Sequence, residues 1–200
     1  MENLTLNTFA LKKDFIKIVK DNIHRDGIDD LMNYIENETD FYTAPASSNY
    51  HSNHEGGLIE HSINVYNRLK TSSIMNNEFS GRYSDETIAI VSLFHDLCKT
   101  NFYKVEMRNT KNDKNQWVKI PYYKIDEAYP YGHGEKSVYM LMKYIKLTDE
   151  EALAINWHMG GFDSRVKGGS YAMNSAYNMS PLALELHIAD LRATFVDENK

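Results

Sequence analysis

Residues 91–99 read Val-Ser-Leu-Phe-His-Asp-Leu-Cys-Lys, an apolar helical run that stops on an adjacent imidazole and carboxylate. A charge buried without a partner is costly or changes its protonation state, so a His-Asp pair on such a helix needs compensation. A divalent cation supplies it, because neutral imidazole and ionised carboxylate both bind Zn, Mn, Fe or Co. Lys99 lies three residues after Asp96, so its ammonium projects from roughly the same side and can reach an anionic substrate. The alternative is a helix C-terminus with a capping His95 and a solvated Asp96.

Four more residues fall on the inner face or at the end of predicted helices. His61 lies on an apolar stripe, and Asp190 lies one turn after a buried leucine. His133 and His158 lie at the edge of two further helices. Each taken alone is more often a packed, ion-paired or surface residue than a ligand. Together with residues 95–96 they supply four imidazoles and two carboxylates, which would fill a two-cation site with one shared carboxylate.

The rest of the chain predicts an all-α fold with one small inserted β-hairpin. We expect a single domain over residues 1–200, in which amphipathic helices over 1–40 serve as packing elements. Aromatic and β-branched runs around a polar stretch predict a hairpin over 102–120, followed by a Tyr-rich loop over 121–131 that either packs or stacks on a base. Residues 162–179 are rich in Gly, Ser, Asn and Tyr, so we expect a loop that acts as a lid.

The segment over residues 41–57 is irregular and contains His51 and His54, three residues apart, before a glycine pair. Loops held by a rigid scaffold often carry function, so both histidines are candidate substrate-binding residues. The alternative is an ordinary surface loop.

Composition narrows the classes of partner. A formal charge of -6 argues against a broad surface that tracks the phosphates of a long nucleic acid, but it permits a small anionic substrate in a local cationic pocket. The apolar runs fall short of the ~18 residues of a membrane span, so we expect no membrane partner. The N-terminus lacks a basic and then apolar leader, and the single Cys98 forms no intrachain disulfide, so we expect a cytoplasmic protein with Cys98 in its core.

The motifs resemble one known family, the HD superfamily of metal-dependent phosphohydrolases, whose pattern is a His, then a His-Asp doublet, then a distant Asp. Residues 56–62 are similar to its first motif, 93–99 to the doublet and 188–190 to the closing Asp, while His133 and His158 are similar to the extra histidines of two-metal members. One departure is Cys98, at a position where many members have Gly.

The resemblance implies an HD-domain helical bundle and two divalent cations, drawn from Mn, Fe, Co, Ni, Zn or Mg. It implies one cation held by His61, His95, Asp96 and Asp190, and a second held by His133, His158 and the shared Asp96. Asp96 and Lys99 would be catalytic: Asp96 bridges the cations, and Lys99 also binds substrate by neutralising the phosphoryl oxygens. The nucleophile would be a water activated by the cations, because metal binding lowers the pKa of water from ~15.7 to about 7.

We therefore expect hydrolysis of a phosphoester bond in a nucleotide, a cyclic nucleotide or a short oligonucleotide. Two alternatives use the same residues. Some HD proteins are similar in carrying four His and two Asp around a di-iron centre that oxidises a small organic substrate with O₂. The second alternative is a protein that binds a nucleotide without turning it over.

Overall fold

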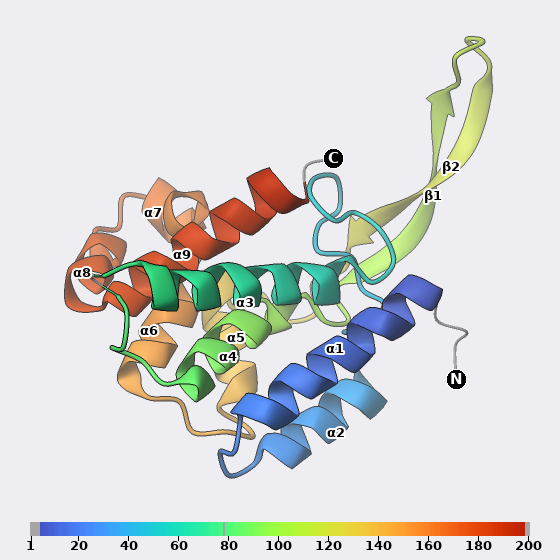
Figure 1. Ribbon diagram of the computed structural model, residues 1–200. Helices are drawn as coiled ribbons and strands as arrows, with labels where there is room; N and C mark the ends of the chain where they lie inside the picture. Colours follow the sequence, from blue (N-terminus) through green and yellow to red (C-terminus); the bar gives the residue numbers. More distant parts are fainter. Residues whose placement is uncertain (1–4, 78, 199–200) are drawn as a thin grey trace.

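The computed structural model describes residues 5–77 and 79–198, and these are mostly helical with a single two-stranded hairpin (Figure 1). Residues 1–4 of the predicted N-terminal segment lie outside the described part. The α-helices are α1 (Leu6–Asn22), α2 (Ile28–Glu38), α3 (Gly57–Met75), α4 (Asp85–Phe94), α5 (His133–Leu141), α6 (Asp149–Trp157), α7 (Ser164–Lys167), α8 (Ala172–Met179) and α9 (Pro181–Arg192). The other elements are two 3₁₀ turns, η1 (Leu97–Lys99) and η2 (Gly160–Phe162), a π-helical turn η3 (Ala193–Asp197), and strands β1 (Tyr103–Lys111) and β2 (Trp117–Ile125).

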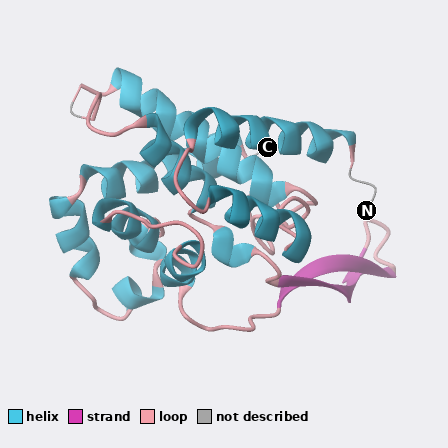
Figure 2. Cartoon of the chain, turned by 90° about the horizontal axis from the view of Figure 1, so that it is seen from below, coloured by secondary structure: helices cyan, strands magenta, loops and turns pink. Residues whose placement is uncertain are grey.

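Helix α3 runs through the middle of the bundle, with α9 on one side and α4 and α1 on the other (Figures 1 and 2). Helix α6 packs on α9 and α5. At the α1 end of the core, the Phe15 ring lies 5.1 Å from the Phe41 ring and 5.8 Å from the Phe94 ring, centre to centre, and all three are fully buried. Such tilted and edge-on aromatic contacts stabilise beyond their buried area. The start of the doublet is therefore anchored in a rigid core.

Two helices of the bundle begin with side-chain caps. The Ser84 hydroxyl accepts a hydrogen bond from the Thr87 amide at the start of α4, and Thr148 with Glu151 forms a capping box on α6. The helix predicted to reach Lys99 ends earlier, at Phe94. After it the chain tightens into 3₁₀ hydrogen bonds, and the doublet occupies the turn between α4 and η1.

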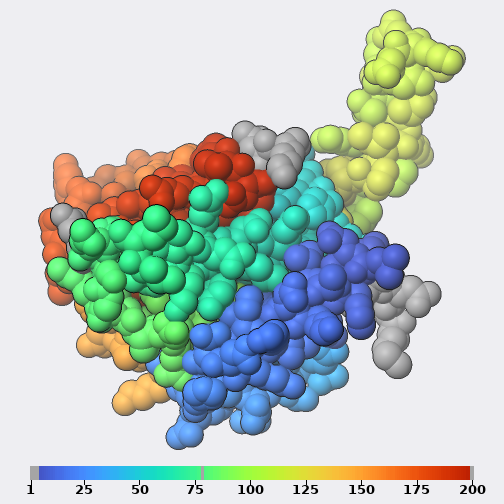
Figure 3. Space-filling model, viewed as in Figure 1, coloured from blue at the N-terminus to red at the C-terminus, as the bar shows by residue number. Residues whose placement is uncertain are grey.

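The hairpin is longer than predicted. Strand β2 continues through Pro121, which pairs with Met107, and takes in half of the Tyr-rich segment that we expected to be a loop. A two-stranded sheet has an open edge along both strands, so a residue without an amide proton is tolerated there. The hairpin stands away from the helical body, and none of its residues is buried (Figure 3).

The prediction of a loop over residues 162–179 is wrong. The short α7 and the two-turn α8 occupy most of this segment, and α8 packs on α9 and α6 through the buried Ala176. The polar composition of this segment indicated a loop, but α8 needs only one small buried side chain, Ala176, to pack. Elsewhere, none of the helices within the described ranges has the length and apolarity to cross a membrane.

Candidate metal centre

Two histidines at helix ends are oriented by their own helices. The Nδ1 atom of His95 lies 2.8 Å from the carbonyl oxygen of Ser92, and the Nδ1 atom of His158 lies 2.6 Å from that of Ile155. A carbonyl oxygen only accepts, so the neutral ring carries its proton on Nδ1 and keeps a lone pair on Nε2. Both rings are fully buried, and the Nε2 atom of His158 has no hydrogen-bond partner among the described residues.

His61 is held in the same way by a carboxylate. Its Nδ1 atom lies 3.0 Å from Oε1 of Glu198, and its Nε2 atom lies 3.2 Å from Nε2 of His95. If each ring carried a single proton, on Nδ1, the two Nε2 lone pairs would face each other, so a positive charge is needed between them, either a metal ion or a second proton on His61. The environment favours such a charge. Burial opposes a charged His61 ring, yet Asp190 and Glu198 outweigh burial and raise its pKa to about 10.

Asp96 joins the two halves of the cluster. Its Oδ1 atom lies 2.7 Å from Nε2 of His133 and 3.3 Å from Nε2 of His158. Its Oδ2 atom lies 3.4 Å from Nε2 of His95 and 3.6 Å from that of His61. One carboxylate therefore presents a different oxygen to each pair of imidazoles, as a carboxylate shared between two cations would.

Asp190 and Lys99 complete the cluster. On α9, Oδ1 of Asp190 lies 3.2 Å from Nε2 of His61. The buried Lys99 ammonium lies 2.6 Å from Oδ2 of Asp96. Burial lowers the pKa of Lys99, but the adjacent carboxylate outweighs it and holds that pKa above the ordinary value. Burial likewise opposes the charge on Asp96, while Lys99 and His95 keep its pKa well below the usual range. Both side chains are therefore charged at neutral pH.

This donor set fits a metal. Several groups of three ligand atoms lie within 4.8 Å of one another, and the orphaned Nε2 of His158 lies in one of them. Imidazole with carboxylate suits Mn, Fe, Co, Ni or Zn. The described groups are His61, His95 and Asp190; His95, Asp96 and His158; Asp96, Cys98 and His133; and His51, His61 and Glu198. The sequence thus predicted a buried His and Asp cluster that could hold metal ions, and the structure brings all six predicted ligands together.

The cluster lies at the wall of a cavity of about 860 Å³. The residues that line it include Lys99 of η1, His133 of α5 and, at the foot of the hairpin, Tyr103. Its remaining wall includes two aromatic residues, Phe162 and Phe195, both half-exposed. A ligand with an anionic part and an apolar part would find a matching surface for each.

Of the two candidate histidines in the irregular segment, His51 lies at the cavity and His54 does not. His51 lines the cavity, with its ring 4.9 Å from that of His61. Burial, with the positive charge of His61, lowers the pKa of His51 to about 4, so it is neutral at pH 7. His54 instead points to Glu60, whose Oε2 lies 3.0 Å from its Nε2, and it is exposed. The prediction that His54 binds substrate finds no support in this position.

Two residues of the site were not predicted. Glu198, which orients His61, also accepts hydrogen bonds from Ser52 and Asn64. Its only sequence signal is its place two helical turns after Asp190. The other is His187 on α9, which lines the cavity and whose Nδ1 lies 2.6 Å from the carbonyl oxygen of His158.

Two glycines explain how the helices approach so closely. A Cβ on Gly57, at the start of α3, would lie 1.9 Å from the carbonyl oxygen of Ser52, and one on Gly134 would lie 2.2 Å from that of Asn156. Gly57 lets the His61 helix meet the loop over residues 41–56. Gly134 lets α5 meet α6, which brings His133 toward His158.

Comparison with known proteins returned no match: no family model matches the sequence, no curated protein matches it, and no solved structure matches the fold. The site is therefore interpreted from its own chemistry.

Proposed function

We propose that this protein is a metal-dependent phosphohydrolase of the HD type, acting on a phosphoester bond of a nucleotide, a cyclic nucleotide or a short oligonucleotide. The observation that carries the proposal is the convergence of the six motif residues, with Asp96 between the two pairs of imidazoles, beside the buried ammonium of Lys99 and on the wall of a cavity. A cation cluster next to a fixed ammonium suits a phosphoryl group, whose oxygens carry the negative charge.

In the proposal one cation is held by His61, His95, Asp96 and Asp190, and a second by His133, His158 and Asp96. When bound, such cations lower the pKa of water and polarise a phosphoryl oxygen. The metals come from the set Mn, Fe, Co, Ni, Zn and Mg, and the imidazole-rich donors favour the transition metals over Mg.

The protein's own side chains perform the remaining tasks. Lys99 pairs with a phosphoryl oxygen of the substrate and stabilises the charge that develops on it. Asp190 orients the attacking water by accepting its hydrogen bond; burial raises the pKa of Asp190, but the His61 contact more than offsets this, so the carboxylate is ionised. Burial raises the pKa of Tyr103 to about 12, so its hydroxyl stays protonated and donates to the substrate.

The test begins with protein purified without added metal, whose metal content is measured. It is then assayed with Mn or Co, under anaerobic conditions, on bis-p-nitrophenyl phosphate and on nucleoside monophosphates, cyclic nucleotides and dinucleotides. We expect hydrolysis of at least one phosphoester without O₂. His95→Ala and Asp96→Ala should lose metal and activity together. His54→Ala is the matched control, because this exposed histidine lies away from the cavity and should keep both.

Two outcomes would contradict the proposal. Metal-loaded protein that hydrolyses none of these substrates would favour the binding protein. Iron content with O₂ uptake on a small organic substrate would favour the oxygenase.

A further inference from the structure

The hairpin and the helical body have opposite charge. The hairpin over residues 103–125 contains six Lys or Arg and two acidic residues, so it carries a formal charge of +4. The chain as a whole carries -6, which leaves -10 for everything else. The overall acidity of the protein therefore conceals one strongly basic element.

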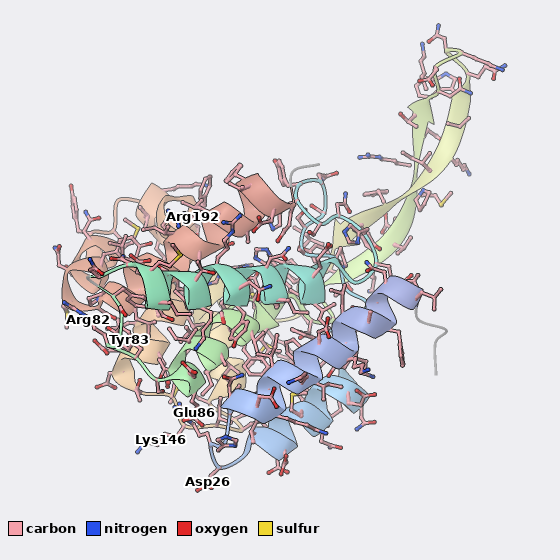
Figure 4. All side chains as sticks on the ribbon, in the orientation of Figure 1. Asp26, Arg82, Tyr83, Glu86, Lys146 and Arg192 are labelled. Carbon is pink, nitrogen blue, oxygen red and sulfur yellow. The ribbon has the colours of Figure 1, made fainter. Side chains whose placement is uncertain are left out.

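Most of this positive charge is unneutralised. Lys104 is ion-paired with Asp126, and Lys124 with Glu106. The other four cations have no carboxylate within salt-bridge distance in the part of the chain that the structure describes; they are Arg108, Lys111, Lys114 and Lys119. All four lie toward the tip of the hairpin, and its side chains stand free on both sides of the ribbon (Figure 4).

One face of the hairpin also presents rings and apolar groups. Cross-strand partners share a face, and Lys111 pairs with Trp117, Val105 with Tyr123. The Trp117 side chain is 71% exposed, and the Lys111 ammonium lies 5.5 Å from the centre of its ring. An exposed ring beside free cations is the combination that binds single-stranded nucleic acids, whose bases stack while their phosphates pair.

The same face leads to the candidate metal centre. Tyr103 pairs with Ile125 at the foot of this face, and Tyr103 also lines the cavity. A nine-residue strand rises ~3.4 Å per residue, so the face extends about 30 Å from the cavity to the tip. A chain-like anion that lies along the hairpin would thus reach the cavity.

We propose that the hairpin binds single-stranded nucleic acid and guides one of its phosphates toward the cavity. If the protein is the proposed hydrolase, this inference narrows its substrates to single-stranded oligonucleotides. Binding to the hairpin does not depend on that function; only hydrolysis of the bound phosphate does. The charge of the body, which repels phosphates, restricts binding to the hairpin. The prediction from overall charge, that no long nucleic acid binds, is thereby limited to the body.

Binding is measured in EDTA, so that hydrolysis plays no part. The probes are fluorescently labelled single-stranded RNA and DNA of about 12 nucleotides, within the range of site sizes known for single-strand binding folds. Arg108 points from the opposite face, so the contacts expected are those of Lys111 and Lys119 on this face and Lys114 at the tip. Three phosphate contacts predict a slope near -2 in a plot of log affinity against log salt, or roughly 20-fold weaker binding at about 200 mM than at about 50 mM. Comparing the two probes tells whether the 2'-hydroxyl contributes.

The test variant reverses three hairpin charges: Lys111→Glu, Lys114→Glu and Lys119→Glu. The matched control reverses three exposed lysines of the body, Lys13→Glu, Lys20→Glu and Lys146→Glu, and so has the same net charge; Lys146 lies at the far end of the molecule from the hairpin (Figure 4). We expect the hairpin variant to bind at least about tenfold more weakly than the control. Thermal melting of both variants verifies that they are folded.

Trp117 provides a second readout. The other tryptophan, Trp157, is buried, so stacking of a base should quench only the Trp117 emission. Trp117→Leu should abolish the quenching, and it should weaken binding.

The outcomes separate this inference from the proposed function. Equal affinity of the hairpin and control variants, or no binding by the native protein, would overturn the inference even if bis-p-nitrophenyl phosphate is hydrolysed. Binding in EDTA together with no hydrolysis by the Mn- or Co-loaded protein would support the inference about the hairpin and contradict the proposed hydrolase function. A native dimer that the hairpin variant turns into monomers, with no nucleic acid bound, would make the hairpin an interface between two copies and overturn the inference.

Discussion

Gly134 of α5 lies so close to Asn156 of α6 that a methyl group on its Cα would stand 2.2 Å from the Asn156 carbonyl oxygen. This contact fixes the separation of the two helices that carry His133 and His158. The geometry of the second proposed cation therefore depends on the absence of one side chain.

Gly134→Ala should separate these helices. Alanine is the better helix former by about 1 kcal/mol, but overpacking against a main-chain atom costs about 1–3 kcal/mol and the clash involves backbone. We expect a lower melting temperature, and a metal content that falls from two ions to one. Gly161→Ala is the control, because no atom lies within 4 Å of its added Cβ. Two ions retained in Gly134→Ala would show that α5 is not needed for the second site.

Glu198→Gln tests the carboxylate that orients His61. The amide keeps the size of the side chain but removes the charge that holds the Nδ1 proton, so metal affinity should fall about 10- to 100-fold. Titration with Zn or Mn followed by calorimetry measures it. The neighbouring carboxylate Asp197 pairs with Arg68 instead, so Asp197→Asn should leave the affinity unchanged. Equal effects of the two substitutions would mean that only overall charge matters.

Lys99→Met removes the ammonium beside Asp96 without removing a metal ligand. Metal content should be kept, whereas kcat should fall about 10²- to 10³-fold, as for the loss of one donor that stabilises transition-state charge. Lys136 is also buried, but it pairs with Glu127 and is not part of the cavity wall. Lys136→Met should therefore lower stability and spare kcat. A full-rate Lys99→Met enzyme would remove Lys99 from the mechanism.

Stability at low pH should depend on Glu151. Burial raises the pKa of Glu151, but its bidentate contact with Arg25 outweighs burial and holds that pKa below its ordinary value of 4.5. A depressed folded-state pKa means that this stabilisation is complete above pH 4.5 and is lost as the pH falls through the folded value.

Glu151→Gln should therefore lower the free energy of unfolding at pH 7 by roughly 3 kcal/mol, toward the low end for a broken buried pair. The difference in the free energy of unfolding between this variant and the native protein should shrink as the pH falls below 4.5. Urea unfolding across this pH range measures it. Glu150→Gln, one residue earlier and exposed, should show a small difference throughout. A gap that widens in acid would contradict the assignment.

The six predicted ligands could be found from sequence because each lies at a helix end or on an inner face that ordinary helix signals reveal. Thr148 and Glu151 form a capping box at the start of α6, which ends beside His158, and Pro181 begins α9, which carries Asp190. These signals are local, so they place side chains on helices. They do not give the distances between helices, which depend on packing.

The errors also have local causes. The predicted hairpin stopped at residue 120, but β2 continues through Pro121, because an edge strand tolerates a residue without an amide proton. The polar residues 162–179 indicated a loop, yet α8 needs little apolar surface. Glu198 belongs to an acidic stretch that reads as solvated, and only the fold turns it inward to His61.

The carbonyl oxygens that hold His95 and His158 belong to the final turns of the helices that carry those rings. A ring that turned away from the centre would break this hydrogen bond and leave its own buried donor without a partner, which resists the turn. The two histidines therefore stay aimed at the centre when it is empty, so rebinding of an ion after chelation should need little rearrangement of these ligands.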